Sequence, residues 1–212
     1  GFLGQMAAMH ACGPYEIDHV FVESFLNYTN LQPSGSIRAP TAPQVCWGLE
    51  QHMDEVAAAL DLDPVELRRR TLIQKGSEGP TRQVFDDVGV RQTLDRAVEM
   101  IGYDRELPDD EAIGVAVGWW PSMPAPSGAY VHLNGDGSGT IVTGAQENGS
   151  GAVVALPTFV AQELGMRPED FTILYQDTAA ANWDRGSCGS QTTFNSGRAV
   201  PAAAADVREQ LF

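Results

Sequence analysis

Apolar side chains recur every three or four residues in three stretches of the chain, residues 45–60, 88–101 and 153–164. This spacing places them on one face of a helix, so we predict a helix in each stretch. Another helix is expected after Asp63, because Asp63, Pro64 and Glu66 supply an N-cap, a first-position proline and a capping-box acid. The alanine-rich tail that ends at Phe212 is expected to be helical as well.

Short alternating or apolar runs predict strands at residues 20–25, 114–119, 129–133, 139–143 and 171–175. The start of the chain is expected to be extended. Residues 134–138 predict a hairpin turn in which Gly135 and Gly137 adopt positive φ. A long loop is expected from Gln176 to Ser190.

A polar, proline-bearing segment at residues 107–111 separates the helical part of the chain from the strand-rich part. We therefore expect an α+β fold with two mixed α/β subdomains, residues 1–109 and 110–212. Loops between strands and helices are the expected binding elements.

The net charge of the chain limits the classes of partner that it can bind. Thirteen basic and 28 acidic side chains give a formal net charge of −15, which disfavours nucleic acid and anionic membranes. The run Arg68, Arg69 and Arg70 is expected to lie solvated at the C-terminal end of its helix, where it complements the dipole. No apolar run approaches the ~20 residues of a membrane span, and we expect a cytoplasmic protein.

Cys12, Cys46 and Cys188 have neither CxxC spacing nor an even count. This pattern supports no zinc site, no disulfide framework and no iron–sulfur cluster. We therefore predict no metal ligands in the chain, and we expect Cys46 to lie in the core.

The segment from Gly144 to Gly151 carries three glycines and joins a predicted strand to a predicted helix. Unpaired N–H groups at a helix start favour anions, and glycine lets a bulky ligand approach. The segment therefore predicts a phosphate-binding loop. The alternative is a glycine-rich turn that holds only water.

Several further segments occur in a recognisable order: 13–17, 28–30, 35–44, 50–55, 63–69, 144–151 and 186–192. Together they resemble the large, molybdopterin-binding subunit of the molybdenum hydroxylases, the family of xanthine dehydrogenase, aldehyde oxidase and carbon monoxide dehydrogenase. The resemblance covers nearly the whole chain and implies an internal part of that subunit.

The resemblance implies that molybdenum is held through molybdopterin, in its cytosine dinucleotide form. It assigns cofactor binding to Arg38, Ala39, Asn148, Gly149, Ser150, Gly151, Cys188, Gly189, Ser190, Gln191 and Thr192. Many relatives have glutamine where Ser150 stands, so the reach of this contact differs. Carbon monoxide dehydrogenases typically carry a cysteine in the loop of Ala39, which disfavours CO oxidation.

The resemblance also implies a substrate pocket formed by Met6, Pro40 and Trp119. Met6 stands where purine-oxidising relatives carry an arginine, and a thioether cannot make that charged contact. Trp119 aligns with an aromatic that stacks flat substrates, whereas Pro40 replaces a second aromatic. We therefore expect oxidation of an aldehyde or an aromatic heterocycle, with water as the oxygen source.

No catalytic residue is expected within the 212 residues, because the general-base glutamate of the family is expected downstream. The chain alone is therefore expected to be inactive. Expected partners are a small-molecule substrate and iron–sulfur and FAD subunits or domains that accept electrons, in an oligomer. The alternative function is a non-catalytic module that binds a pterin or nucleotide phosphate.

Overall fold

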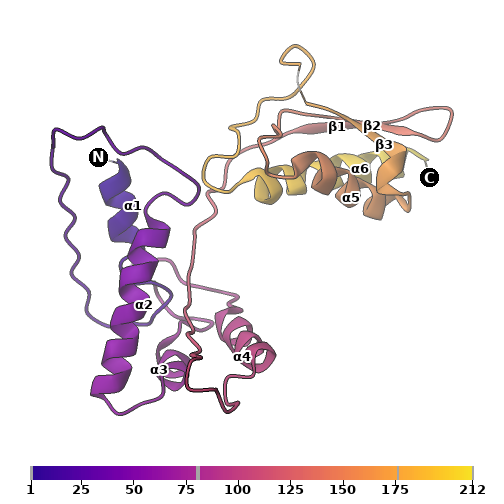
Figure 1. The fold of residues 1–212 in the computed structure, drawn as a ribbon. Helices are drawn as coiled ribbons and strands as arrows, with labels where there is room; N and C mark the ends of the chain where they lie inside the picture. Colours follow the sequence, from indigo (N-terminus) through magenta and orange to yellow (C-terminus); the bar gives the residue numbers. More distant parts are fainter. Residues whose placement is uncertain (1, 80–81, 176, 212) are drawn as a thin grey trace. The chain divides into compact units, whose positions relative to one another are not determined.

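The computed structural model describes residues 2–79, 82–175 and 177–211, and the chain forms two compact units, Gly1–Trp120 and Pro121–Phe212 (Figure 1). Helices and a small mixed sheet give the predicted α+β fold. Gln176 and Phe212, where the predicted loop begins and the predicted tail ends, lie outside the described residues.

In its described part the first unit contains the helices α1 (Phe2–His10), α2 (Ala42–Ala59), α3 (Pro64–Thr71) and α4 (Val90–Ile101). The predictions of α2, α3 and α4 are confirmed. The Asp63 carboxylate caps α3, accepting the backbone N–H groups of Val65 and Glu66, both at 2.9 Å. The expected extended start is wrong, because α1 occupies it. This segment is apolar almost throughout, so it lacks the polar face that marks an amphipathic helix.

The core of the first unit encloses a buried arginine. Arg68 is fully buried and donates from Nε to Glu50 Oε2 at 2.9 Å and from a terminal nitrogen to Asp54 Oδ1 at 2.7 Å. The prediction that the three-arginine run is solvated is therefore wrong for Arg68, because two carboxylates on α2 compensate its charge. Tyr15 donates to Glu50 Oε1 at 2.6 Å, and burial together with this bond raises the pKa of Tyr15.

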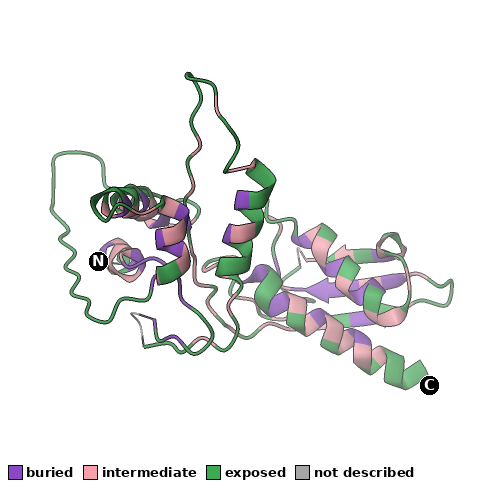
Figure 2. Ribbon diagram, turned by 90° about the horizontal axis from the view of Figure 1, so that it is seen from below, coloured by how far each residue is buried: buried purple, intermediate pink, exposed green. Residues whose placement is uncertain are grey.

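Two predicted strands are absent from the described residues. Residues 16–38 have no helix or strand and are exposed, as the green segment in Figure 2 shows, so the strand at 20–25 is wrong. Residues 114–119 also lack regular structure. A strand needs a neighbour that accepts and donates its backbone hydrogen bonds, and an alternating pattern alone does not supply one.

The second unit is built on three strands, β1 (Ala129–Leu133), β2 (Gly139–Thr143) and β3 (Phe171–Leu174), all predicted. β1 and β2 are antiparallel, whereas β2 and β3 are parallel. The turn between β1 and β2 forms as predicted, with the Asn134 N–H donating to the Ser138 carbonyl at 2.8 Å. Only Gly137 takes positive φ there, 86°, so the expectation for Gly135 is wrong.

Helices α5 (Ala152–Leu164) and α6 (Gly197–Leu211) cover one face of this sheet (Figure 1). The 3₁₀ turn η1 (Pro168–Asp170) precedes β3, and the π-helical turn η2 (Thr192–Ser196) precedes α6. Because β2 and β3 are parallel, the chain leaves both strands at the same edge of the sheet. That edge therefore carries the two loops for which the sequence predicts cofactor binding.

Candidate cofactor site

The two loops touch at the carboxyl edge of the sheet. The Asn148 side chain donates from Nδ2 to Ser187 Oγ at 2.6 Å. The two loops also approach closely at Gly144, where an added Cβ atom would lie 2.2 Å from the carbonyl oxygen of Asn182. The fold thus joins Asn148 of the predicted segment 148–151 to Ser187, the residue before the predicted segment 188–192, although the two segments are far apart in the sequence.

The first loop is closed by one of its own carboxylates. Glu147 Oε1 accepts the N–H groups of Gly149 at 2.8 Å and Gly151 at 3.1 Å, and Oε2 accepts that of Val153 at 3.2 Å. These bonds, led by that of Gly151, lower the pKa of Glu147. The prediction that the N–H groups at this helix start are unpaired is therefore wrong at these three residues.

Asp184 holds the second loop in place. Its Oδ1 accepts the Gly186 N–H at 2.7 Å, and its Oδ2 accepts the hydroxyls of Ser127 at 2.7 Å and Ser196 at 3.2 Å. The carboxylate therefore ties the loop to the segment just before β1 and to η2. The sequence prediction did not include this residue.

Gln191 supports the same loop from inside. It is 1% exposed, donates to the Gly186 carbonyl at 2.7 Å and accepts from the Asn195 amide at 2.7 Å. Thr192 is also buried, at the start of η2. Cys188 and Ser190 are exposed, and Ser190 takes a φ of 56°. The exposed side chains between Gly186 and Thr192 are therefore those of Cys188 and Ser190.

An open groove of about 590 Å³ lies beside this loop in the second unit. It is lined by residues 124–127, Asn195, Arg198 and Ala199. Arg198 is the cationic group of this lining, and its guanidinium lies 5.9 Å from the ring centre of Phe194. The groove therefore presents a positive charge next to neutral hydrogen-bonding groups.

In the first unit, the predicted loop at Arg38 forms a strained turn before α2. Arg38 is exposed, and Ala39 and Thr41 take φ values of 54° and 67°. A β-branched residue such as threonine rarely adopts this left-handed conformation, which concentrates at functional sites. Thr41 Oγ1 is buried and has no hydrogen-bond partner among the described residues.

Met6 and Trp119, both predicted for the substrate pocket, each contact His10, Met6 through its backbone carbonyl and Trp119 through its ring. Met6 is buried, and its carbonyl accepts from His10 Nδ1 at 2.6 Å. The His10 ring stacks on Trp120 at 5.1 Å and lies tilted against Trp119 at 5.7 Å. His10 Nε2 and both indole nitrogens are buried and lack partners among the described residues. No described hydrogen bond or ring contact links Pro40 to this group.

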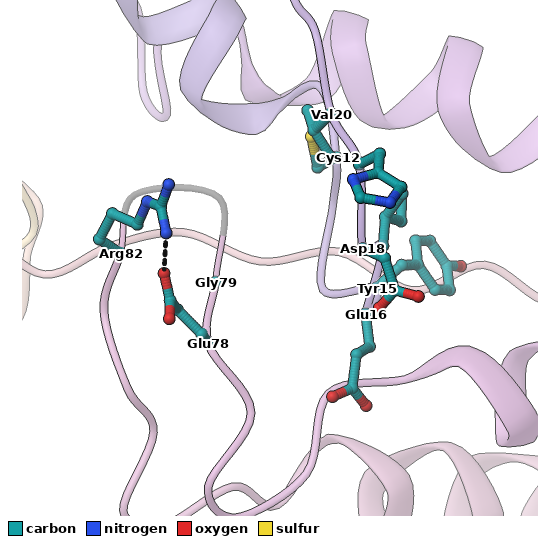
Figure 3. Close-up of a pocket in the computed structure, with 10 residues that line it drawn as sticks. Cys12, Tyr15, Glu16, Asp18, Val20, Glu78, Gly79 and Arg82 are labelled. Atoms are coloured by element: carbon teal, nitrogen blue, oxygen red, sulfur yellow. Dashed lines mark hydrogen bonds and ion pairs between the residues drawn. The ribbon is translucent and has the colours of Figure 1, made fainter.

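A separate hollow of about 550 Å³ opens elsewhere in the first unit (Figure 3). Glu78 and Arg82 form an ion pair at 2.9 Å on one side of it, and Tyr15, Glu16 and Asp18 lie opposite. None of the residues predicted for cofactor or substrate binding lines this hollow.

Sequence reasoning assigned no role to Glu147, Asp184, His10 or Thr41. An acid two residues before a glycine at a helix start was the available signal for Glu147, whereas the roles of the other three residues depend on contacts made by the fold.

Within the described ranges, no three His, Cys, Asp or Glu side chains are grouped as metal ligands. The helices described here include none that is long and apolar enough to cross a membrane.

Known proteins share this architecture. The crystal structure of an aldehyde oxidoreductase from Desulfovibrio desulfuricans matches with a TM-score of 0.83 and 25% identity, over 98% of this chain and 24% of that chain. The chain is 28% identical over 199 residues to a putative xanthine dehydrogenase molybdenum-binding subunit of Escherichia coli, over 87% of this chain and 26% of that protein. It is 27% identical over 188 residues to an aldehyde oxidoreductase of Megalodesulfovibrio gigas, and the match covers 82% of this chain and 21% of that protein.

The chain thus spans about a quarter of the length of the curated relatives it matches. Molybdopterin cofactor-binding domains match residues 2–72 and residues 96–212, and the second match alone covers more than half of the chain. These matches include both loops at the carboxyl edge of the sheet and the strained turn before α2. The chain therefore belongs to the molybdopterin cofactor-binding domain family.

Proposed function

We propose that the chain is part of the catalytic subunit of a molybdenum hydroxylase, which oxidises an aldehyde or an aromatic heterocycle with water as the oxygen source. The hydrogen bond between Asn148 and Ser187 carries this proposal, because it joins the two loops at one edge of the sheet. The names of the relatives, xanthine dehydrogenase and aldehyde oxidoreductase, support the reaction class. When bound, molybdopterin with its molybdenum supplies the redox chemistry.

The second unit fits a phosphate-bearing cofactor through neutral donors. Asn148, Ser150 and Ser190 are exposed on the two loops, and their side chains can donate to phosphate oxygens. Gly149, Gly151, Cys188 and Gly189 line the same loops, and Gln191 and Thr192 support them from inside. Arg198 adds a local positive charge, which matters because the chain carries a net charge of −15.

Within the first unit, we assign cofactor binding to the turn at Arg38 and Ala39. The Thr41 hydroxyl, which has no hydrogen-bond partner in the described part of the chain, gives this turn a hydrogen-bonding group that suits a polar ligand. We propose Met6, Trp119 and Pro40 as walls of an apolar substrate pocket that favours uncharged planar molecules over charged ones; the described contacts link Met6 and Trp119 to His10, and Pro40 rests on the family resemblance. His10 is the polar group of this wall.

The complete enzyme requires an electron acceptor, and this chain has too few cysteines for an iron–sulfur cluster. We propose iron–sulfur and FAD subunits or domains as acceptors, in a cytoplasmic oligomer. One relative is named the gamma subunit of a dehydrogenase complex, which supports a multi-subunit assembly. The cytosine dinucleotide form of the cofactor is part of the same proposal.

The proposal predicts that the full-length protein contains molybdenum. Expressed with sufficient molybdate and then denatured, it is expected to release one pterin nucleotide for each molybdenum atom. Metal analysis by mass spectrometry and chromatography of the released pterin measure both. Purified protein with neither molybdenum nor pterin would exclude the function, whereas pterin without aldehyde or heterocycle oxidation would favour the non-catalytic module.

The turn before α2 gives a second prediction. Thr41→Gly is expected to raise the free energy of unfolding by about 1 kcal/mol, because glycine adopts the φ of 67° without strain. The same change removes the unpartnered hydroxyl and is expected to lower the pterin content. Urea unfolding and pterin analysis measure the two effects. Thr41→Ser keeps the hydroxyl and is the control, so an equal loss of pterin in both variants would contradict a role for Oγ1.

A further inference from the structure

The turn from Glu147 to Val153 is closed by a single carboxylate of the chain itself. Helix α5 begins at Ala152, and its N-cap residue Gly151 has no side chain to accept the first N–H groups. Glu147 supplies these acceptors from outside the helix, taking N–H groups from Gly149, Gly151 and Val153 at 2.8–3.2 Å. It therefore replaces the N-cap side chain that most helices have.

Packing does not impose the conformation of this turn. Gly149 and Gly151 take φ values of 91° and 78°, and a Cβ atom added to either would have no neighbour within 4 Å. Without contacts that hold it, a glycine turn has many accessible conformations. The three bonds to the Glu147 carboxylate favour this one from within the turn, and the positive end of α5 favours the charge of the carboxylate.

The selected conformation fixes the position of Asn148, which lies between Glu147 and Gly149. The amide of Asn148 reaches Ser187 Oγ at 2.6 Å on the second loop. We propose that Glu147 is a positioning residue that holds Asn148 against Ser187 and so keeps the two cofactor loops together. The link to the cofactor rests on the proposed function, whereas the bonds of Glu147 within its own turn do not.

The charge of Glu147 also directs where a phosphate binds. Three N–H groups that a phosphate could use at the start of α5, those of Gly149, Gly151 and Val153, are bonded to Glu147, and a second anion there would be repelled by the carboxylate. A phosphate is therefore bound by the side chains of Asn148, Ser150 and the second loop. The opposite possibility is that Glu147 only occupies the anion position until a phosphate displaces it. The two cases predict opposite effects when the carboxylate is removed.

The test compares Glu147→Ala, Glu147→Gln and Glu147→Asp with the wild-type full-length protein. Glu169→Gln is the matched control, because it removes an exposed acid of the same unit far from the loop in sequence. Hydrogen exchange of the amides of residues 149–153 measures the turn, pterin retained after dialysis measures the ligand, and the melting temperature measures global stability.

In Glu147→Ala, we expect exchange of these amides to be about tenfold faster and pterin affinity about tenfold weaker, with little change in melting temperature. Glu147→Gln keeps one oxygen acceptor, and Glu147→Asp keeps the charge on a shorter side chain. For both variants we expect exchange rates and pterin affinities between those of the wild type and Glu147→Ala. Glu169→Gln should match the wild type. Unchanged exchange in Glu147→Ala, or tighter pterin binding in Glu147→Ala or Glu147→Gln, would overturn the proposal. Wild-type protein without pterin would instead refute the proposed function, and the exchange measurement would still decide the role of Glu147 in the turn.

Discussion

Glu50→Ala is expected to lower the free energy of unfolding of the first unit by about 3–5 kcal/mol. Glu50 is 5% exposed, and its Oε2 accepts from Arg68 Nε at 2.9 Å and from the Val117 N–H at 2.7 Å. Alanine leaves the fully buried guanidinium of Arg68 without this partner and leaves the Val117 N–H and the Tyr15 hydroxyl without acceptors. Asp54 is then the one carboxylate that still pairs with Arg68 among the described residues, at 2.7 Å, and the loss of half of its charge compensation adds to the cost of the unpaired donors.

Urea unfolding measures this loss, and Glu55→Ala is the matched control. Glu55 lies on the same helix but is exposed, and it pairs with the exposed His52. Its removal is expected to change the free energy by less than about 0.5 kcal/mol. The double variant Glu50→Ala with Arg68→Ala should lose less than the sum of the two single changes, because the bond between Glu50 and Arg68 is then counted once and neither of these two groups is left buried without the other. A loss below about 1 kcal/mol in Glu50→Ala would contradict a compensated buried pair.

The helices that the sequence predicts correctly are those with local signals. Helix α4 shows its apolar face directly, and the Asp63 carboxylate caps α3 as its sequence indicates. The wrong predictions concern segments whose structure depends on partners elsewhere in the chain or whose sequence has no amphipathic period. The alternating residues 20–25 remain without a strand because no pairing neighbour is present in the described chain, and helix α1 is too uniformly apolar to show a period.

Arg68 shows why burial of a charge is hard to predict. Its neighbours Arg69 and Arg70 follow the expected pattern, since each is at least partly exposed and pairs with an acid near the surface. Arg68 points instead to Glu50 and Asp54, which stand four residues apart on α2 and thus on one helix face. That spacing of two acids was a signal in the sequence, but only the packing of α2 against α3 selects which arginine meets them.

The candidate site was predictable as two loops but not in its bonding. Glycine content located the first loop, and family resemblance located both. Asn148 and Ser187 lie 39 residues apart, and their contact depends on the parallel pairing of β2 and β3. The sequence did not predict that Glu147 accepts the N–H groups of its own turn, because a glycine-rich helix start is usually interpreted as a binding site for an external anion.

Gly144→Ala is expected to separate the two loops of the cofactor site. A Cβ atom at Gly144 would lie 2.2 Å from the carbonyl oxygen of Asn182 and 2.8 Å from Cβ of Asp184. The first of these neighbours is backbone, so the clash cannot be relieved by rotating a flexible side chain. Overpacking of this kind costs about 1–3 kcal/mol. Movement of the loop at Asp184 would also carry Ser187 away from Asn148.

We therefore expect Gly144→Ala to lower both the free energy of unfolding and the pterin content of the full-length protein. Gly135→Ala is the matched control, because a Cβ atom there meets nothing within 4 Å and its φ is not in the left-handed region. This control should unfold and retain pterin like the wild type. Gly149→Ala distinguishes backbone strain from a steric clash, because a Cβ atom there meets nothing within 4 Å but the φ of Gly149 is 91°. If the variant at Gly144 behaves like the variant at Gly135, the close approach of the two loops is not what holds the cofactor site together.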